Sequence, residues 1–430
     1  MVIVFALLAL TVLVTANWYL WRRLFRDTTS GPGRARRVGA VLIGGGWLLA
    51  IGALVAERTG APFWLQRVLA WPGFLWLALS IYLLLAVVAG ELVRPLLGRF
   101  LERRDRRGEP AAAAVPHPER VPAGAPAEKP REAVRPSEEP GAEEQREPGP
   151  AALGTAPSRR LFVSRVVAGA AAAAAVGTVG QGTYGVLRGP RVKRVTVPLA
   201  KLPRAAHGYR IAVVSDIHLS PVLGRGFAQK VVDTINSTSP DLIAVVGDLV
   251  DGSVKDLGPA AAPLAGLEAR HGSFFVTGNH EYFSGAEQWV EEVRRLGLRP
   301  LENDRTELAW FDLAGVNDIA GESEGQGPDF AKALGDRDTA RACVLLAHQP
   351  VQIHDAVDHG VDLQLSGHTH GGQLWPGNLL AEAANPTVAG LERYGDTQLY
   401  VSRGAGAWGP PTRVGAPSDI TVIELASKQA

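Results

Sequence analysis

The sequence predicts a layered α/β or β-sandwich domain that follows several membrane helices. Near-continuous apolar runs at 209–214 and 241–246 are typical of strands that are covered on both faces. Apolar residues at helical spacing lie between these two runs, which indicates a strand, helix, strand unit. Closer to the amino terminus, several apolar stretches approach or exceed the ~20 residues that cross a bilayer, which predicts the membrane helices.

The amino-terminal part of the chain holds three such stretches, at residues 2–21, 38–56 and about 68–93. A cleaved signal peptide is the alternative for 2–21, but no basic region precedes it and two further spans follow. Pro72 lies near the start of the third stretch, where a helix tolerates proline best. Amphipathic core helices are a poor alternative because none of the three stretches shows a polar face. We therefore expect three transmembrane helices.

Arginine placement predicts the orientation of these helices. Arginines crowd the connection after the first span and the chain after the third, whereas the connection near 57–67 holds only Arg58 and Arg67. By the positive-inside rule, the amino terminus lies outside and residue 94 onward is cytoplasmic. The net charge of +1 hides this segregation and gives no reason to expect a nucleic-acid partner. The two basic groups are Arg22, Arg23, Arg26, Arg34, Arg36 and Arg37, and Arg94, Arg99, Arg103, Arg104, Arg106 and Arg107.

Residues 94–157 are expected to form a basic flank and a disordered cytoplasmic linker. From 108 onward this segment is rich in Pro, Ala, Glu and Arg and poor in large apolar side chains. Such a composition cannot bury enough apolar surface to offset the loss of chain entropy.

Residues 158–188 combine a pair of arginines with an apolar stretch. Arg159-Arg160-Leu161-Phe162, followed by Ala- and Gly-rich sequence to about 187, is similar to a twin-arginine export signal. The alternative is the basic flank of a fourth transmembrane helix. Both interpretations place residues 189–430 on the extracytoplasmic side of a multi-pass cell-membrane protein. We favour the first, which implies the twin-arginine translocation machinery as a partner.

Within 189–430, strand and helix signals alternate. Phe227, Val231, Val232 and Ile235 recur at helical spacing between the first two apolar runs. A third run at 273–277 continues the pattern. Later runs, which indicate a second sheet, lie at 342–347, 361–365, 398–402 and 419–425.

Short polar motifs follow the apolar runs, at the points where strands would end. They are Ser215-Asp216-Ile217-His218, Gly247-Asp248, Gly278-Asn279-His280-Glu281, Ala347-His348 and Gly367-His368-Thr369-His370. If the strand ends share one sheet edge, seven oxygen and nitrogen ligands converge there. Imidazole and carboxylate ligands together suit manganese, iron and zinc. A carboxylate such as Asp248 can bridge two ions, and an ion pair of this kind clamps a phosphoryl group and activates water.

In this order, the motifs D-x-H, G-D, G-N-H-[DE], H and G-H-x-H resemble the calcineurin-like metallophosphoesterases. The longer signature at 367–373, GHTHGGQ, resembles that of a membrane-associated bacterial subgroup. The resemblance covers about residues 207–425. It implies a four-layer αββα sandwich, an α/β (α+β) fold, with the site at the carboxyl ends of the strands.

The resemblance also implies a role for each site residue. Asp216, His218 and His370 would hold the first metal, and Asn279, His348 and His368 the second, with Asp248 between them. His280 would contact the phosphate or protonate the leaving oxygen as a general acid. Glu281, where the family more often shows aspartate, would orient His280.

The expected activity is hydrolysis of a phosphodiester, phosphomonoester or pyrophosphate, with two divalent ions (Mn, Fe or Zn) as cofactors. Membrane tethering suggests a lipid-linked or cell-envelope substrate. Two alternatives stay open: a non-catalytic metal-binding envelope module, and a sensor or transporter-like membrane protein with an appended domain. A structural metal site has no use for a general acid, and the first three spans show no charge constellation typical of an ion path. We therefore favour the enzyme.

Two further expectations concern apolar residues in the domain. Cys343 is the only cysteine, which excludes an intramolecular disulfide, and its apolar neighbours predict a small buried hydrophobe. Trp310, Phe311, Trp375 and Leu379 lie in segments expected to border the site. We expect these four to fill the core rather than to contact an acyl chain.

Overall fold

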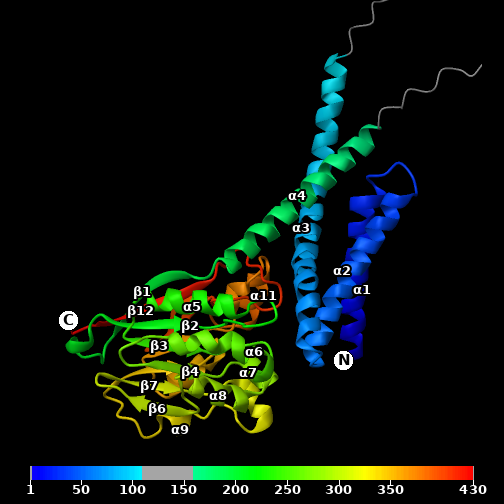
Figure 1. The fold of residues 1–430 in the computed structure, drawn as a ribbon. Helices are drawn as coiled ribbons and strands as arrows, with labels where there is room; N and C mark the ends of the chain where they lie inside the picture. Colours follow the sequence, from blue (N-terminus) through cyan, green and yellow to red (C-terminus); the bar gives the residue numbers. More distant parts are fainter. Residues whose placement is uncertain (1, 109–157, 430) are drawn as a thin grey trace, which may run out of the picture.

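Four long helices lead into a two-sheet domain in the computed structural model, which describes residues 2–108 and 158–429 (Figure 1). The helices are α1 (Val2–Trp21), α2 (Arg34–Arg58), α3 (Phe63–Gly108) and α4 (Arg159–Leu187). Among the described residues, three segments are long and apolar enough to cross a membrane: α2, residues 63–104 of α3, and α4.

Helix α3 extends well beyond the expected end of the third span. The span was expected to end at 93, but the helix continues to Gly108. The added segment is rich in Arg and Leu, which are strong helix formers. A basic composition therefore marks the end of the apolar span without ending the helix. The rest of the expected linker, residues 109–157, lies outside the described residues.

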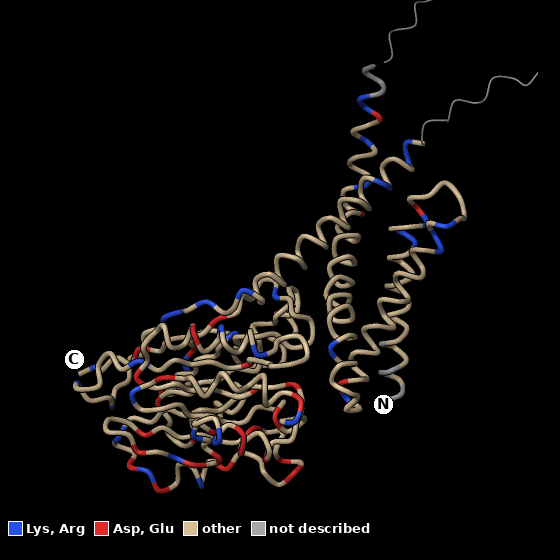
Figure 2. The backbone as a smooth tube through the Cα atoms, in the orientation of Figure 1, with Lys and Arg blue, Asp and Glu red and all other residues tan. Residues whose placement is uncertain are grey.

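The arginines gather at the end of the helices away from the domain (Figure 2). Arg23, after α1, donates a hydrogen bond to Glu91 of α3 at 2.8 Å. Arg165 of α4 donates to the Thr28 carbonyl at 3.0 Å. These contacts join the basic ends of α1, α3 and α4 on one side of the bundle.

The domain contains two mixed six-stranded sheets. In spatial order the first consists of β1 (Arg191–Leu199), β12 (Asp419–Ser427), β2 (Tyr209–Val214), β3 (Leu242–Val246), β4 (Ser273–Val276) and β5 (Arg299–Pro300). The second consists of β10 (Gly390–Tyr394), β11 (Thr397–Val401), β9 (Leu363–Ser366), β8 (Ala342–Leu346), β7 (Phe311–Gly315) and β6 (Asp304–Glu307).

Three apolar cores hold four layers together, as the αββα prediction requires. Side chains alternate along each strand, so Ile211 of β2 faces the core between the sheets while Ala212 faces the helices. The helical layer on the first sheet consists of α5 (Arg225–Asn236), α6 (Val254–Ala261) and α8 (Ala286–Arg295). The layer on the second consists of α9 (Phe330–Leu334) and α10 (Ile353–Asp358). The four-layer α/β fold is confirmed.

One strand lies in a different sheet from the one we expected. The apolar run at 419–425 was assigned to the second sheet, but β12 lies in the first, parallel to β1 and antiparallel to β2. An apolar run shows that a strand is buried on both faces and does not show which neighbour it pairs with.

The apolar residues near the site divide into two groups. Cys343 and Phe311 are fully buried, as expected. The expectation of a core position is wrong for Trp375 and Leu379, which are 53% and 60% exposed. Leu379 belongs to α11 (Gly377–Ala384), a helix with no buried residue that lies beside the long helices (Figure 1). Trp375 and Leu379 are therefore part of an exposed apolar surface beside the long helices.

The bundle and the domain are in direct contact. Helix α4 leads into β1 within a few residues, and Thr183 of α4 lies 2.8 Å from the Thr412 hydroxyl. Tyr82 of α3 donates a hydrogen bond to the Trp375 carbonyl at 2.9 Å. The domain is therefore held against the side of the helices as well as connected to their end.

Candidate metal centre

The polar motifs meet where strands of the two sheets end. Asp216 and Asp248 follow β2 and β3, while His348 and His368 follow β8 and β9. Asn279 and His280 begin a short helix after β4, α7 (Asn279–Ser284). Parallel strands bring their carboxyl ends to one edge, which is where α/β sheets bind ligands.

Five of the seven expected ligands adopt a left-handed backbone conformation. The φ angles are 51° at Asp216, 47° at His218, 53° at Asp248, 73° at His368 and 53° at His370. In the described part of the chain only eight non-glycine residues have positive φ. Such conformations each cost about 1–3 kcal/mol and concentrate at functional sites. These backbone conformations therefore lower the stability of the turns, and they direct the five side chains toward the centre of the site.

The first group of ligand atoms consists of Asp216, His218 and His370, which lie within 4.8 Å of one another. The Nε2 atoms of the two histidines are 3.0 Å apart, and His370 Nε2 is 3.4 Å from Asp216 Oδ1. Arg413 lies 3.0 Å from His370 Nδ1. All three side chains are buried.

The second group consists of Asp248, His348 and His368. Asp248 Oδ2 lies 3.2 Å from His348 Nε2 and 3.7 Å from His218 Nε2, so this carboxylate stands between the two groups. Asn279 Oδ1 is 2.9 Å from His368 Nδ1. The structure thus brings all seven expected ligands together.

These residues suit divalent cations. His348 Nε2 is buried without a hydrogen-bond partner, and Asp248, Asp216 and Asp318 act together to hold the pKa of His348 well above its ordinary value against the effect of burial. Burial and His348 lower the pKa of His368 to about 4. Burial raises the pKa of Asp248, but His348 and His218 outweigh this and hold it well below its ordinary range. The carboxylates around His348 therefore favour a positive charge at this place, and a divalent cation would supply it in place of the proton.

Glycines allow the ligand-bearing turns to approach each other. Gly247 has a φ of 72°, and a Cβ added there would lie 2.5 Å from His348 Nδ1. A Cβ at Gly367 would collide with the Asp216 carboxylate. Only glycine fits such close backbone approaches.

His280 is held by a carboxylate that the sequence did not single out. Asp251 Oδ1 lies 2.7 Å from His280 Nδ1 and 2.8 Å from His218 Nδ1. Burial lowers the pKa of His280, but the hydrogen bond and charge of Asp251 outweigh this and raise it to about 9. Asp251 therefore joins the expected general acid to a metal-ligating histidine. Its only signal in the sequence was an acidic residue three positions after Asp248.

Glu281 makes contacts other than the one we expected. Its carboxylate accepts hydrogen bonds from the backbone N–H groups of Asp248 at 2.9 Å, Leu249 at 2.8 Å and Gly278 at 2.6 Å. Burial and the charge of Asp248 raise the pKa of Glu281 to about 7. Glu281 fixes the turns that carry Asp248 and Asn279, while the contact to the His280 ring comes from Asp251.

Comparison with known proteins agrees with this geometry. Residues 209–372 match the family model described as calcineurin-like phosphoesterase, a range that includes every expected ligand. Over 275 residues the chain is 37% identical to an "Uncharacterized metallophosphoesterase" of Helicobacter pylori, covering 63% of this chain and 74% of that protein. The chain belongs to the calcineurin-like phosphoesterase family.

The name of one other metallophosphoesterase relative describes a transmembrane protein. The chain is 41% identical over 256 residues to a "Transmembrane protein with metallophosphoesterase domain" of Danio rerio, covering 56% of this chain. It spans 58% of that relative's length. An "Uncharacterized metallophosphoesterase" of Aquifex aeolicus is 35% identical over 243 residues, covering 55% of this chain and 92% of that protein.

Proposed function

We propose that this metallophosphoesterase is a membrane-anchored hydrolase that uses two divalent metal ions. Asp216, His218 and His370 would hold one ion and Asn279, His348 and His368 the other, with Asp248 between them. The convergence of these seven side chains where the two sheets end, five of them in left-handed turns, carries the proposal. When bound, such ions polarise a phosphoryl oxygen and lower the pKa of a nearby water.

The protein's own residues supply the remaining chemistry. His280 stands beside the ligand groups with its Nδ1 atom on Asp251, so its Nε2 atom is free to give a proton to the leaving oxygen. Asp251 positions His280 and at the same time orients His218, as outer-sphere carboxylates do for metal-ligating histidines. Glu281 keeps the Asp248 and Asn279 turns in register.

The substrate we propose is a phosphodiester, phosphomonoester or pyrophosphate of a lipid or other envelope molecule. The domain rests against the long helices through Tyr82 and Thr183. Its exposed apolar helix α11 lies on the same side (Figure 1). Both features favour a substrate at the membrane surface over one in bulk water.

We further propose that the domain lies outside the cytoplasm and that Arg159 and Arg160 begin a twin-arginine export signal. The basic end of the bundle lies opposite the domain (Figure 2), which fits the positive-inside rule. Cys343 offers a clean background for a test, because it is fully buried and burial raises its pKa to about 12. An impermeant maleimide on intact cells should label Ser323→Cys in the domain and spare Ser30→Cys between α1 and α2. The reverse pattern would contradict this topology.

The proposed activity is tested by stripping the full-length protein of metal and titrating it with manganese, zinc and iron. Hydrolysis of an aryl phosphodiester and an aryl phosphomonoester is measured, with Asp248→Asn as the inactive control. Metal-dependent turnover that is lost in the control supports a phosphoesterase, and the diester-to-monoester ratio narrows the substrate class. A folded protein that binds two ions and hydrolyses neither ester would favour the non-catalytic envelope module.

A further inference from the structure

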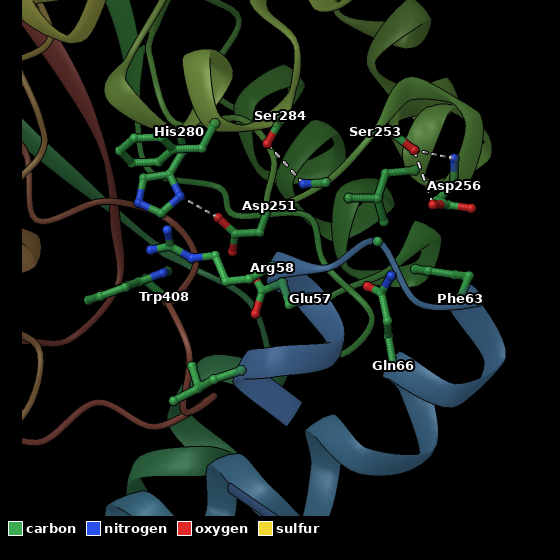
Figure 3. A pocket seen from close by; sticks show the side chains of 15 residues that line it. Glu57, Arg58, Phe63, Gln66, Asp251, Ser253, Asp256, His280, Ser284 and Trp408 are labelled. Atoms are coloured by element: carbon green, nitrogen blue, oxygen red, sulfur yellow. Dashed lines mark hydrogen bonds and ion pairs between the residues drawn. The ribbon is translucent and has the colours of Figure 1, made fainter. Parts of the chain in front are cut away.

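A cavity of about 450 Å³ lies between the membrane helices and the metal centre. One side is formed by residues at the turn between α2 and α3, among them Glu57, Arg58 and Phe63. The other side is formed by the domain through Asp251, His280 and Trp408 (Figure 3). The anchor is therefore part of the surface that surrounds the reaction site.

The cavity lies on the side of the metal centre where the leaving group departs. His280, the expected general acid, lines the cavity and is held there by Asp251. Its ring packs edge-on against Phe283 at 5.6 Å and Trp408 at 5.7 Å between ring centroids. A leaving oxygen that takes its proton from His280 has the remainder of its group in this space.

The turn brings two polar side chains to this cavity. The Arg58 guanidinium lies over the Phe283 ring, 5.7 Å from its centroid, and Phe283 in turn contacts the His280 ring. The Glu57 carboxyl group stands beside it and points into the same space (Figure 3). Arginine only donates hydrogen bonds and a carboxyl oxygen accepts them, whereas a hydroxyl does both. A polyol or sugar satisfies such a pair, and an acyl chain would leave both polar groups without a hydrogen-bond partner.

The cavity lies at the ends of two apolar helices, at the level where the polar surface of a bilayer is expected. Val55 and Trp64 near the turn are exposed apolar side chains outside the cavity lining, and Trp64 is 66% exposed. Apolar side chains at the end of a span require lipid, and tryptophan favours the level of the headgroups. The cavity lies at that level.

We propose that the α2–α3 turn forms one wall of the substrate pocket and that Arg58 and Glu57 select a polar, hydroxyl-bearing leaving group of a membrane phosphoester. This inference rests on the proposed phosphoesterase activity. For a lipid such as phosphatidylglycerol, water adds to phosphorus and the bond to the glycerol oxygen breaks. The glycerol oxygen takes its proton from His280, and the products are phosphatidate and glycerol.

The test uses the full-length, metal-loaded protein in nanodiscs and two lipids that differ only in the leaving group. Phosphatidylglycerol offers hydroxyls to the pocket, and phosphatidylethanol offers none. The ratio of kcat/KM for the first lipid to that for the second is measured. Loss of a hydrogen bond should lower this ratio about tenfold in Arg58→Ala and in Glu57→Ala. Arg67→Ala, an exposed arginine of the same hairpin outside the cavity lining, is the matched control and should keep the wild-type ratio.

Three outcomes would overturn the inference. They are a wild-type protein that hydrolyses the aryl diester without preferring phosphatidylglycerol, an unchanged ratio in both turn variants, and an equal fall of the ratio in Arg67→Ala. None of these affects the proposed activity, which the aryl diester and Asp248→Asn test separately. Bound metal, measured in each variant, shows whether a change in the turn has disturbed the metal centre.

Discussion

The helical bundle and the metallophosphoesterase domain differ in where their charged and apolar side chains lie. The domain buries Asp216, His218 and His348 completely, at the edge of two sheets. The bundle keeps most of its arginines at the end away from the domain, where Arg23 pairs with Glu91, and leaves apolar side chains such as Leu48 exposed. Buried ionisable groups are costly unless they are paired or coordinate a metal, whereas exposed apolar helices are costly unless lipid covers them. We therefore expect ions to complete the domain and a bilayer to cover the bundle.

The sharpest test of this comparison removes the carboxylate that stands between the two ligand groups. Asp248→Asn should reduce bound metal and lower metal-dependent kcat/KM by at least about a hundredfold, since even outer-sphere partners contribute 10–100-fold. Asp355→Asn on the exposed face of α10 is the matched control and should behave as wild type. Metal content and activity that both survive the Asp248 change would refute the ligand assignment.

Metal removal should affect the domain and spare the bundle. Ions that bind only the folded state stabilise it by about 2.7 kcal/mol at a concentration a hundred times Kd. Chelation should therefore lower the melting temperature of the domain, followed by tryptophan fluorescence. Helix α2 should show the same hydrogen exchange before and after chelation. A bundle that loosens together with the domain would show that the two are not completed independently.

Removal of the carboxylate that positions His280 should have a smaller effect. Asp251→Asn should lower kcat about 10- to 100-fold, the range for a group that orients a metal-ligating histidine. Residues that act as a unit are not additive. The double variant with His280→Ala should therefore lose less than the product of the two single losses, and its excess loss over His280→Ala alone measures what Asp251 contributes through His218. Independent, multiplying losses would contradict a role for Asp251 through His280.

The smallest effect is expected at the surface that faces the membrane. Leu380 of α11 is 78% exposed, so Leu380→Ser should change the free energy of unfolding in detergent by no more than about 0.5 kcal/mol. Leu365, fully buried between the sheets, should lose about 2–5 kcal/mol as Leu365→Ala. Lipid vesicles should shift the fluorescence of the wild type more than that of Leu380→Ser if α11 contacts the bilayer. Equal shifts would argue against that contact.

The strands, the helices and the polar motifs could be predicted because each depends on a local pattern, and the order of the motifs carried the family resemblance that implied the four layers and the ligand roles. Apolar runs, helical spacing and motifs such as Gly-Asp and His-x-His can each be recognised within a short segment of the sequence. Prediction failed where the outcome depends on distant partners. The position of β12 is decided by its pairing with β1 and β2, and nothing in residues 419–427 records this. Asp251 looks like any loop aspartate until the fold places His218 and His280 on it.

Exposure of the residues beside the membrane escaped prediction for a related reason. Trp375 and Leu379 look like core residues because an apolar side chain in a globular domain is usually buried. Here the neighbouring helices are long and apolar enough to cross a membrane. An exposed Leu379 beside them is therefore reasonable. The left-handed turns at Asp216 and His370 could not be predicted either, because neither residue type requires a positive φ angle.

The pairing of β1 with β12 has a consequence for the order of biosynthesis. Strand β1 follows α4 almost at once, yet its partner in the sheet is the last strand in the domain. A ribosome must translate residues 191–427 before this edge of the sheet can close. Insertion of α4 and closure of the sheet are thus separated by the synthesis of the whole domain. Until then β1 is an unpaired edge open to aggregation.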